Sequence, residues 1–432
     1  MSPELIGLVG MAVMLGLIAL RVPVAIAMMA VAVVCYGQIV NYPAALARLG
    51  ADAFHGAASY SLSVIALFVL MGLLLAAAGL GEDTYRALDT FLGRTRGGLA
   101  VATLGASALF ASVSGSAVAS ATTMSVVAVP QMRKFGYDSG LSAACAAVGG
   151  TLGALIPPSA VLVLYGVLTE ESIGALLMAG ILPGVITAGL LMATAYAVIR
   201  RRPELGGGKD SENGLGWWPA LRLVWPVPLI FLVSMGGIFY GVFTPTEGGA
   251  AGAALALIYG VGTRRLRWRR FVDALSTTVR TTAFIFFLVI AGKIFGFFLA
   301  VSRIPFEVTD FVAGISAPPW VIVAVIFAVY FILGALMDEI AILVIMTPIV
   351  YPVVIDLGYD GVWFGVLTIM MLLTGLVTPP VGLITFVVSG VTRIPLVQVF
   401  RRLTPFIVSL SLAILLLIAF PDLALWLPGL AD

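Results

Sequence analysis

Charged residues are scarce in this chain. Asp, Glu, Lys and Arg together make up 10% of its 432 residues, whereas 61% are hydrophobic. A soluble domain carries about 25% charged residues, so this chain could not cover a surface that faces water. The composition therefore predicts an integral membrane protein. The net charge of +2 indicates no particular partner, and no nucleic acid is expected as one.

Cysteine and histidine are also nearly absent. The two cysteines, Cys35 and Cys145, lie in apolar stretches and indicate neither a disulfide framework nor a metal site. The only histidine, His55, falls in a segment that we interpret as a polar loop on the outer side of the membrane, where a catalytic role is not expected. We therefore predict that the chain is not an enzyme. No basic region precedes the first apolar segment, 4–20, which we interpret as a retained span.

A long segment in the middle of the chain has a second, similar copy later in the sequence. Its helix-breaking residues recur 222 positions later: Gly153, Pro157, Pro158 and Pro183 return as Gly375, Pro379, Pro380 and Pro405. Pro130 and the run 136–138 return at the same offset, as Pro352 and 358–360. A membrane protein made of two similar halves, each with an interrupted helix, has the sequence signature of a secondary transporter.

Apolar segments of roughly 17–25 residues can each span a membrane as a helix. In the first half, 1–200, we expect spans at 4–20, 23–40, 58–80, 140–168 and 173–199, and a re-entrant hairpin at 98–130. In the second half, 223–432, we expect spans at 223–241, 246–262, 275–300, 362–390 and 397–420, and a hairpin at 318–355. A polar linker, 201–222, joins the halves. The predicted fold class is an all-α polytopic membrane protein with two repeats, each carrying a hairpin and a broken helix (140–168 and 362–390).

The predicted topology has an internal test in the basic residues. Each half makes five crossings, and this odd number inserts the second half upside down relative to the first. With the N-terminus outside, the inside loops carry Arg21, Arg86, Arg94, Arg96, Arg133, Lys134, Arg200, Arg201, Arg202, Arg264, Arg265, Arg267, Arg269, Arg270 and Arg393. The outside loops carry Arg48 and Arg303 with several acids. This asymmetry follows the positive-inside rule and predicts that both termini lie outside.

Both halves place two consecutive prolines in a span. A proline removes a backbone donor and clashes with the preceding turn, so a pair beside glycine unwinds the helix. Unwound backbone persists in a membrane only where it is buried in protein or lines a cavity. Its freed carbonyl oxygens suit a hard monovalent cation, and the adjoining helix N-termini suit an anion. A kink that only shapes packing is the alternative, and the duplication at matched positions favours a binding site.

The two hairpin tips differ in chemistry. The first, 112–116, carries serine hydroxyls and a glycine, which could offer oxygens to an ion or simply allow close helix packing. The second contains Asp338, which matches Ser116 at the repeat offset, followed by Glu339. An acidic side chain at the centre of a spanning helix costs ~2.5–3.5 kcal/mol, so Asp338 is a candidate ion ligand or proton carrier. The alternatives are a salt bridge to Lys293 and, for Glu339, a water-facing position.

Four stretches carry a family resemblance. They are GGTLGALIPPSAVLVLYGVLTEESIGALLMAGILPG at 149–184, GLVTPPVGLITFVVSG at 375–390, the phrase from Gly334 to Asp338, and SGSAVA at 114–119. With them the chain resembles the large membrane (M, DctM-like) subunit of the tripartite ATP-independent periplasmic (TRAP) transporters. The resemblance covers essentially the whole chain.

The resemblance implies a sodium-driven importer of organic acids that works by an elevator motion. The hairpins and broken helices would move against a scaffold of the remaining helices. A small membrane subunit, as a separate chain, would enlarge that scaffold, and a periplasmic binding protein would deliver the substrate. The expected location is the bacterial inner membrane, with periplasmic termini. No cofactor is expected besides sodium as the coupling ion.

The resemblance also implies two sodium sites, each between a hairpin tip and a broken helix. Carried over to matching positions, the first site comprises Ser114, Gly115, Gly150, Thr151 and Pro157, and the second Gly334, Asp338, Gly375, Thr378 and Pro379. Candidate substrate contacts are Ser116, Pro158, Ser159, Thr374 and Pro380. The chain departs from many relatives by having Glu339 in place of proline, and Met371 and Ile384 in place of asparagine, so its substrate contacts are expected to differ.

The leading hypothesis is sodium-coupled import of a small carboxylate or sulfonate. An anion that moves inward opposes the negative interior at ~2.3 kcal/mol per charge per 100 mV, and two or more sodium ions reverse that penalty.

A proton-coupled transporter that uses Asp338 and Glu339 is the alternative. An intramembrane hydrolase with Ser114 or Ser116 as nucleophile would need a base within reach. A channel would not need duplicated hairpins. The scaffold segments, 4–40 and 223–262, should pack on lipid and on the small subunit.

Overall fold

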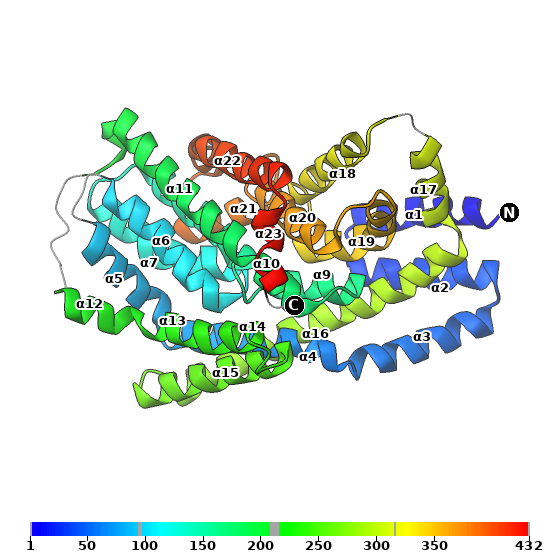
Figure 1. Ribbon diagram of the computed structural model, residues 1–432, viewed down its shortest axis with the longest axis horizontal. Coiled ribbons are helices and arrows are strands. Elements are labelled where there is room, and N and C mark those ends of the chain that lie inside the picture. The colour runs from blue at the N-terminus through cyan, green and yellow to red at the C-terminus, as the bar shows by residue number, and fades with distance from the viewer. Residues whose placement is uncertain (1, 94–96, 208–215, 315–316, 431–432) are drawn as a thin grey trace.

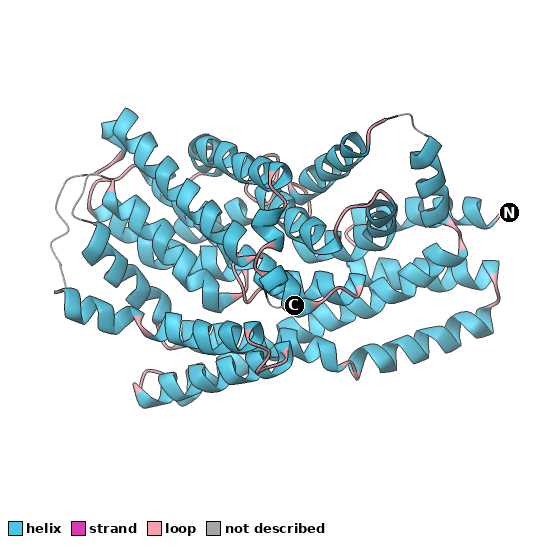
Figure 2. Ribbon diagram, in the orientation of Figure 1, coloured by secondary structure: helices cyan, strands magenta, loops and turns pink. Residues whose placement is uncertain are grey.

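The computed structural model describes residues 2–93, 97–207, 216–314 and 317–430. Within these ranges all regular structure is helical and no strand occurs (Figure 2). The predicted all-α class is therefore confirmed. Arg94 and Arg96, and the part of the predicted linker at 208–215, lie outside the described residues.

Each half of the chain contains a helical hairpin followed by an interrupted helix pair. The first half comprises α1 (Pro3–Ala19), α2 (Val24–Ile39), α3 (Tyr42–Ala57), α4 (Tyr60–Ala77), α5 (Leu80–Leu92), α6 (Gly98–Ser114), α7 (Ala117–Lys134), α8 (Ser139–Leu155), α9 (Ala160–Thr169), α10 (Ile173–Ala179) and α11 (Ile181–Arg201). A 3-10 turn, η1 (Pro203–Leu205), follows. Hairpin α6–α7 and the interrupted pair α8–α9 occupy the segments predicted for them.

The second half comprises α12 (Trp217–Val224), α13 (Pro226–Phe231), the π-helical turn η2 (Leu232–Gly236), α14 (Gly237–Phe239), α15 (Pro245–Gly262), α16 (Trp268–Val301), α17 (Ile304–Gly314), α18 (Pro319–Gly334), α19 (Glu339–Asp356), α20 (Gly361–Gly375), α21 (Leu383–Thr392), α22 (Leu396–Ala419), α23 (Asp422–Leu425) and η3 (Pro428–Leu430). Here the hairpin is α18–α19 and the interrupted pair is α20–α21.

Several of these elements are long and apolar enough to cross a membrane. Six uninterrupted candidates are found in the described residues: Tyr60–Ala77, Ile173–Arg201, Trp217–Phe239, Trp268–Val301, Glu339–Asp356 and Leu396–Ala419. The pair α8 and α9, bent by 41°, forms a seventh. Shorter apolar helices, including α1, α2, α6, α18, α20 and α21, lie at further predicted spans and hairpin arms. The chain is a multi-pass membrane protein.

Helices of one half pack on helices of the other in reciprocal pairs. Helix α4 packs on α15, and α16 packs on α2; likewise α9 packs on α19, and α21 packs on α7. Two copies related by a two-fold axis produce such exchanged contacts. In Figure 1, α3, α4 and α15 lie along the lower edge and α11, α22 and α18 along the upper edge. Helices α9, α20 and α21 of the two interrupted pairs are seen between these two sets.

Helix α12 begins inside the predicted linker, and three further helices lie where the sequence predicted loops: α3, α5 and α17. Each carries apolar residues at helical spacing among polar ones, which a search for long apolar runs overlooks. Asn41 caps α3 by accepting a bond from the backbone N–H of Ala44 at 2.8 Å. The prediction that His55 lies in a loop was therefore wrong, because it occupies the exposed last turn of α3. Helix α16 also begins earlier than predicted, at Trp268 rather than 275.

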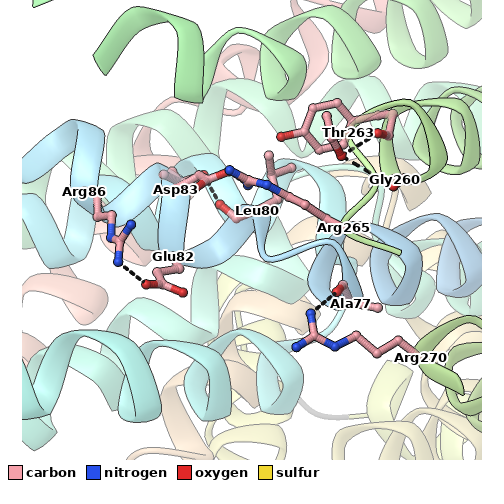
Figure 3. A network of polar contacts seen from close by, with 11 residues as sticks. Ala77, Leu80, Glu82, Asp83, Arg86, Gly260, Thr263, Arg265 and Arg270 are labelled. Carbon is pink, nitrogen blue, oxygen red and sulfur yellow. Dashed lines mark hydrogen bonds and ion pairs between the residues drawn. The ribbon is translucent and has the colours of Figure 1, made fainter. Parts of the chain in front are cut away.

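A polar network ties α5 to the turn between α15 and α16 (Figure 3). The Arg265 guanidinium pairs with the Asp83 carboxylate, and Arg270 donates to the Ala77 carbonyl at 3.3 Å. Arg86 pairs with Glu82 on α5 itself at 2.6 Å. Burial raises the pKa of Asp83 above its ordinary value, and Arg265 opposes that rise. The helix that leads into the first hairpin is thus attached to the second half of the chain.

Candidate functional site

The first broken helix has a short, buried break. Helix α8 ends at Leu155 and α9 begins at Ala160, and the peptide bond between Pro157 and Pro158 is cis. The Ser159 hydroxyl donates to the carbonyl of Ala154 at 2.5 Å and accepts from the N–H of Leu162 at 3.2 Å. Ser159 therefore satisfies one carbonyl freed by the break and caps the second half-helix. All of 156–159 is buried.

The first hairpin tip is a compact cluster of hydroxyls. Helix α6 ends at Ser114, Gly115 takes a left-handed conformation with φ +65°, and Ser116 caps α7. The Ser114 and Ser120 hydroxyls lie 2.6 Å apart. This arrangement directs hydroxyl oxygens toward the point where the two arms meet.

The tip and the break meet directly in the first half. The N–H of Ala160 donates to the carbonyl of Gly115 at 3.3 Å. A Cβ built on Gly115 would lie 2.8 Å from the Pro158 carbonyl oxygen, and one on Gly153 would lie 2.5 Å from that of Ser116. Only glycine allows backbones this close. The structure thus brings the predicted residues Gly115 and Pro158 into contact.

The remaining predicted residues of the first site lie on α8, beside the same hairpin. A Cβ on Gly150 would lie 2.4 Å from the Cβ of Ala121, so α8 is in close contact with α7. The Thr151 hydroxyl is buried and donates to the Val148 carbonyl at 2.7 Å. Hydroxyl and carbonyl oxygens are thus concentrated here, without a carboxylate among the residues predicted for this site.

The second broken helix has a longer and more exposed break. Helix α20 ends at Gly375 and α21 begins at Leu383. The peptide bond between Pro379 and Pro380 is cis, and both prolines are exposed. The hydroxyls of two predicted residues donate to backbone carbonyls of α20: Thr374 to Met370 at 2.7 Å, and Thr378 to Thr374 at 2.6 Å.

The second tip also contacts its break through backbone groups. A Cβ on Gly375 would lie 2.6 Å from the carbonyl carbon of Gly334, so the predicted residues Gly334 and Gly375 meet backbone to backbone. The N–H of Gly382 donates to the carbonyl of Ala335 at 3.2 Å. The donors in the two halves, Ala160 and Gly382, are separated by the repeat offset of 222.

The two acids of the second tip have different surroundings. Asp338 is partly exposed and caps α19 by accepting from the N–H of Ile340 at 3.0 Å, as Ser116 caps α7. Glu339 is 6% exposed, and its Oε2 has no hydrogen-bond partner among the described residues. The buried acid is therefore Glu339, a point the sequence left open.

The structure does not contain the salt bridge between Asp338 and Lys293 that the sequence allowed. Lys293 is exposed on α16, and the four ion pairs found in the described ranges do not include it. The charge of Asp338 is met by the N-terminus of its own helix instead.

One polar connection between the halves was missed by the sequence analysis. The Tyr351 hydroxyl donates to Glu171 Oε1 at 2.5 Å, and the Tyr165 hydroxyl donates to the Gly361 carbonyl at 2.9 Å. Tyr165 and Glu171 flank the end of α9, whereas Tyr351 and Gly361 belong to the second half. The only sequence signal was an acid placed within a long apolar string, which does not identify its partner.

The geometry gives no support to a hydrolase. The recorded partner of the Ser114 hydroxyl is another hydroxyl, that of Ser120, and not a base. His55 lies on α3, which packs on α2 and α16 rather than beside the hairpin tip. No group of three or more His, Cys, Asp or Glu residues within the described ranges is placed to hold a metal ion.

Comparison with known proteins gives a family match along nearly the whole chain. A family model described as tripartite ATP-independent periplasmic transporter, DctM component, matches residues 11–423. The isethionate TRAP transporter permease protein DctMQ of Oleidesulfovibrio alaskensis is 33% identical over 379 residues, which cover 87% of this chain and 59% of that protein. The chain thus matches less than two thirds of that relative's length.

Two further relatives match along most of their own length. The sialic acid TRAP transporter large permease protein SiaM of Vibrio cholerae is 33% identical, with 87% of this chain and 88% of the relative covered. The C4-dicarboxylate TRAP transporter large permease protein DctM of Pseudomonas aeruginosa is 31% identical, with 90% of each covered. Among solved structures, the Alcanivorax borkumensis YdaH transporter superposes with a TM-score of 0.64 at 14% identity, covering 88% of this chain and 87% of that one. That likeness shows the fold alone.

Proposed function

Because this chain belongs to the DctM component family of the tripartite ATP-independent periplasmic transporters, permeases for the secondary transport of organic acids, we propose that it imports a small organic anion together with sodium. The observation that carries the proposal is the contact of hairpin tip and broken helix, made twice: Ala160 to Gly115, and Gly382 to Ala335. Duplicated helix breaks are the usual place for coupling ions in secondary transporters.

Sodium is the coupling ion that fits the oxygens present. The first site would draw on Ser114, Gly115, Gly150, Thr151 and Pro157, which supply neutral hydroxyl and carbonyl oxygens. A divalent ion prefers carboxylates, whereas a monovalent ion can be held by neutral oxygens. The second site would draw on Gly334, Asp338, Gly375, Thr378 and Pro379, and its one carboxylate gives it the stronger pull on a cation.

The substrate anion would lie between the two ion sites. The half-helices α9 and α21 begin at the two breaks, and their N-termini attract negative charge. The candidate contacts are Ser116, Pro158, Ser159, Thr374 and Pro380. The Ser159 hydroxyl is already engaged at both its donor and acceptor positions, so we assign its role to shaping the break. The names of the three relatives refer to isethionate, sialic acid and C4-dicarboxylates, which are all organic anions.

Transport would proceed by an elevator motion in the bacterial inner membrane, with both termini periplasmic. The hairpins and broken helices would move, and α1, α2 and α12–α15 would belong to the scaffold. Exposed apolar side chains on α1, such as Leu8 and Leu15 at 55% each, suit contact with lipid and with a separate small membrane subunit. A periplasmic binding protein would deliver the substrate. No catalytic role is assigned.

The test is uptake by proteoliposomes that contain this chain with its small subunit. A binding protein loaded with a radiolabelled carboxylate or sulfonate supplies the substrate, and an inward sodium gradient is compared with potassium or choline at equal ionic strength. We expect accumulation that requires both sodium and the binding protein. Uptake at the full rate in choline would remove the sodium coupling.

One observation favours a second candidate, proton coupling through the tip acids. Glu339 is buried with an unpartnered carboxyl oxygen, next to the partly exposed Asp338. A buried acid without a partner is the kind of group that exchanges protons in membrane transporters. Under this scheme Glu339→Gln and Asp338→Asn would retain substrate exchange and lose accumulation driven by a pH gradient. Under the sodium scheme Glu339→Gln keeps sodium-driven accumulation, whereas Asp338→Asn weakens the response to sodium.

A further inference from the structure

A groove with an excess of positive charge lies between α11 and α22, far along the chain from the hairpin tips. Its volume is about 570 Å³, and four arginines line it, two at the end of α11 and two near the start of α22: Arg201, Arg202, Arg401 and Arg402. None of the described residues that line it is acidic. The two helices pack against each other, so one groove collects guanidinium groups from both halves of the chain.

Most of this charge is unpaired. Arg402 alone has an acidic partner, Asp138, whose carboxylate oxygens it reaches at 3.0 and 3.3 Å. For Arg201, Arg202 and Arg401 no ion pair or side-chain hydrogen bond is found in the described part of the chain, and all three are exposed. The positive end of the α22 dipole is offset by the negative end of the α11 dipole, which carries Arg201 and Arg202. The groove therefore carries a net positive charge.

The rest of the groove is apolar, and an apolar surface continues beyond it. Its walls include Leu141, Val198 and Pro405. Further along the same face of α22, at helical spacing from Arg401, the exposed side chains are Val408, Leu412 and Leu415. Both α11 and α22 belong to candidate membrane spans. A ligand that fits must therefore join a negative head to a long apolar body.

We propose that this groove binds the phosphate headgroup of an anionic phospholipid, whose acyl chains lie along the exposed stripe of α22. Arginine is suited to this because its planar guanidinium donates two parallel hydrogen bonds to phosphate. Basic pockets between spanning helices at the cytoplasmic side are known sites for such headgroups. The lipid would join the last spans of the two halves. The site depends on charge and shape and does not rest on sodium coupling.

The test compares lipids on the purified full-length chain in a neutral detergent. The unfolding midpoint is followed while a diphosphate phospholipid (cardiolipin), a monophosphate anionic lipid (phosphatidylglycerol), a zwitterionic lipid (phosphatidylcholine) or inorganic phosphate is added. We expect both anionic lipids to raise the midpoint, cardiolipin at the lowest concentration, and phosphatidylcholine and inorganic phosphate to have no effect. Stabilisation by inorganic phosphate equal to that by lipid would overturn the proposal in favour of a soluble anion. An equal response to phosphatidylcholine would show that charge is not recognised.

The groove itself is tested by the double variant Arg201→Gln/Arg401→Gln. Each arginine near an anionic headgroup contributes about a factor of five in affinity, so the apparent affinity for cardiolipin should fall about twenty-five-fold. The matched control is Arg222→Gln/Arg269→Gln, which removes the same charge from exposed positions on α12 and α16 that do not line the groove. The control should bind like the parent chain. Equal losses in both double variants would mean that only net charge matters, and an unchanged affinity in the groove variant would place the lipid elsewhere. Either result contradicts the proposal.

Discussion

The two places where a hairpin tip meets a broken helix share a backbone contact but differ in the length of the break and in chemistry. In the first half the break at 156–159 is buried, and the capping position of the second arm is Ser116. In the second half the prolines of the break are exposed, and the matched capping position is Asp338. Both halves thus have a hydrogen bond between tip and break and a close glycine contact, whereas the charge and the exposed break belong to the second half.

The two helices that lead into the hairpins, α5 and α17, also differ, in their ion pairs. Helix α5, before the first hairpin, is tied to the other half by the pair of Asp83 and Arg265. Its counterpart α17, before the second hairpin, carries Glu307 and Asp310, which are exposed and absent from the ion pairs found among the described residues. The first hairpin is therefore held at its entry by an ion pair, whereas α17 meets the other half through packing on α1. We expect the second hairpin to be the one that opens toward the substrate.

The largest expected effect tests what the two copies share. A Cβ at Gly153 or Gly375 would lie within 2.6 Å of backbone atoms of the opposing hairpin, namely the carbonyl oxygen of Ser116 and the carbonyl carbon of Gly334. Backbone cannot yield as a side-chain tip can, so Gly153→Ala and Gly375→Ala should each cost about 1–3 kcal/mol of stability and abolish most uptake. Unfolding midpoints and proteoliposome uptake measure this.

The control for these substitutions is Gly189→Ala in α11, where an added Cβ has no heavy atom within 4 Å. It should leave uptake unchanged and favour the helix slightly. Full uptake by Gly375→Ala would show that the tip and the break do not need to approach each other so closely.

The next effect sharpens the chemical difference. Asp338→Ser gives the second tip the residue that the first tip has at the matched position, and serine still caps the helix. Because only the charge is lost, we expect little change in stability and a sodium half-saturation concentration about tenfold higher, the loss typical of one charge-assisted contact. The sodium dependence of the initial uptake rate measures this, and Ser116→Ala, which removes no charge from the first tip, is the comparison. An unchanged sodium dependence in Asp338→Ser would remove this residue from the site.

Most of the fold and part of the site could be predicted from the sequence. Apolar runs located the spans, and the recurrence of Pro157–Pro158 as Pro379–Pro380 located both breaks, because helix breakers act locally. The amphipathic helices α3, α5 and α17 were missed, since their apolar residues never form a run. The partner of Glu171 could not be predicted, because its contact with Tyr351 joins residues 180 apart in sequence. The proposed assignment of sodium ligands stays a prediction.

A smaller effect is expected at the ion pair between Asp83 and Arg265, which ties α5 to the second half of the chain. Removing the guanidinium in Arg265→Gln leaves the buried Asp83 carboxylate without its partner. The raised pKa of Asp83 means that the folded protein binds its proton more readily than the unfolded chain, so stability falls as pH rises through that pKa. Arg265→Gln raises this pKa further and should cost about 1–2 kcal/mol at pH 7.5, and less at pH 5. Unfolding midpoints at the two pH values measure this, and adding Asp83→Asn should restore most of the loss.

The smallest expected effect is a difference in local opening between the two hairpin tips. The first tip has a hydrogen bond that the second lacks in the described structure, between the Ser114 and Ser120 hydroxyls. One such bond contributes about 1 kcal/mol, which corresponds to roughly fivefold slower local opening. Amide hydrogen exchange at 112–118 should therefore be about fivefold slower than at 335–341, and Ser120→Ala should reduce the difference. Faster exchange at the first tip would reverse the assignment of the mobile hairpin, because the buried break and the anchored α5 would then fail to hold it.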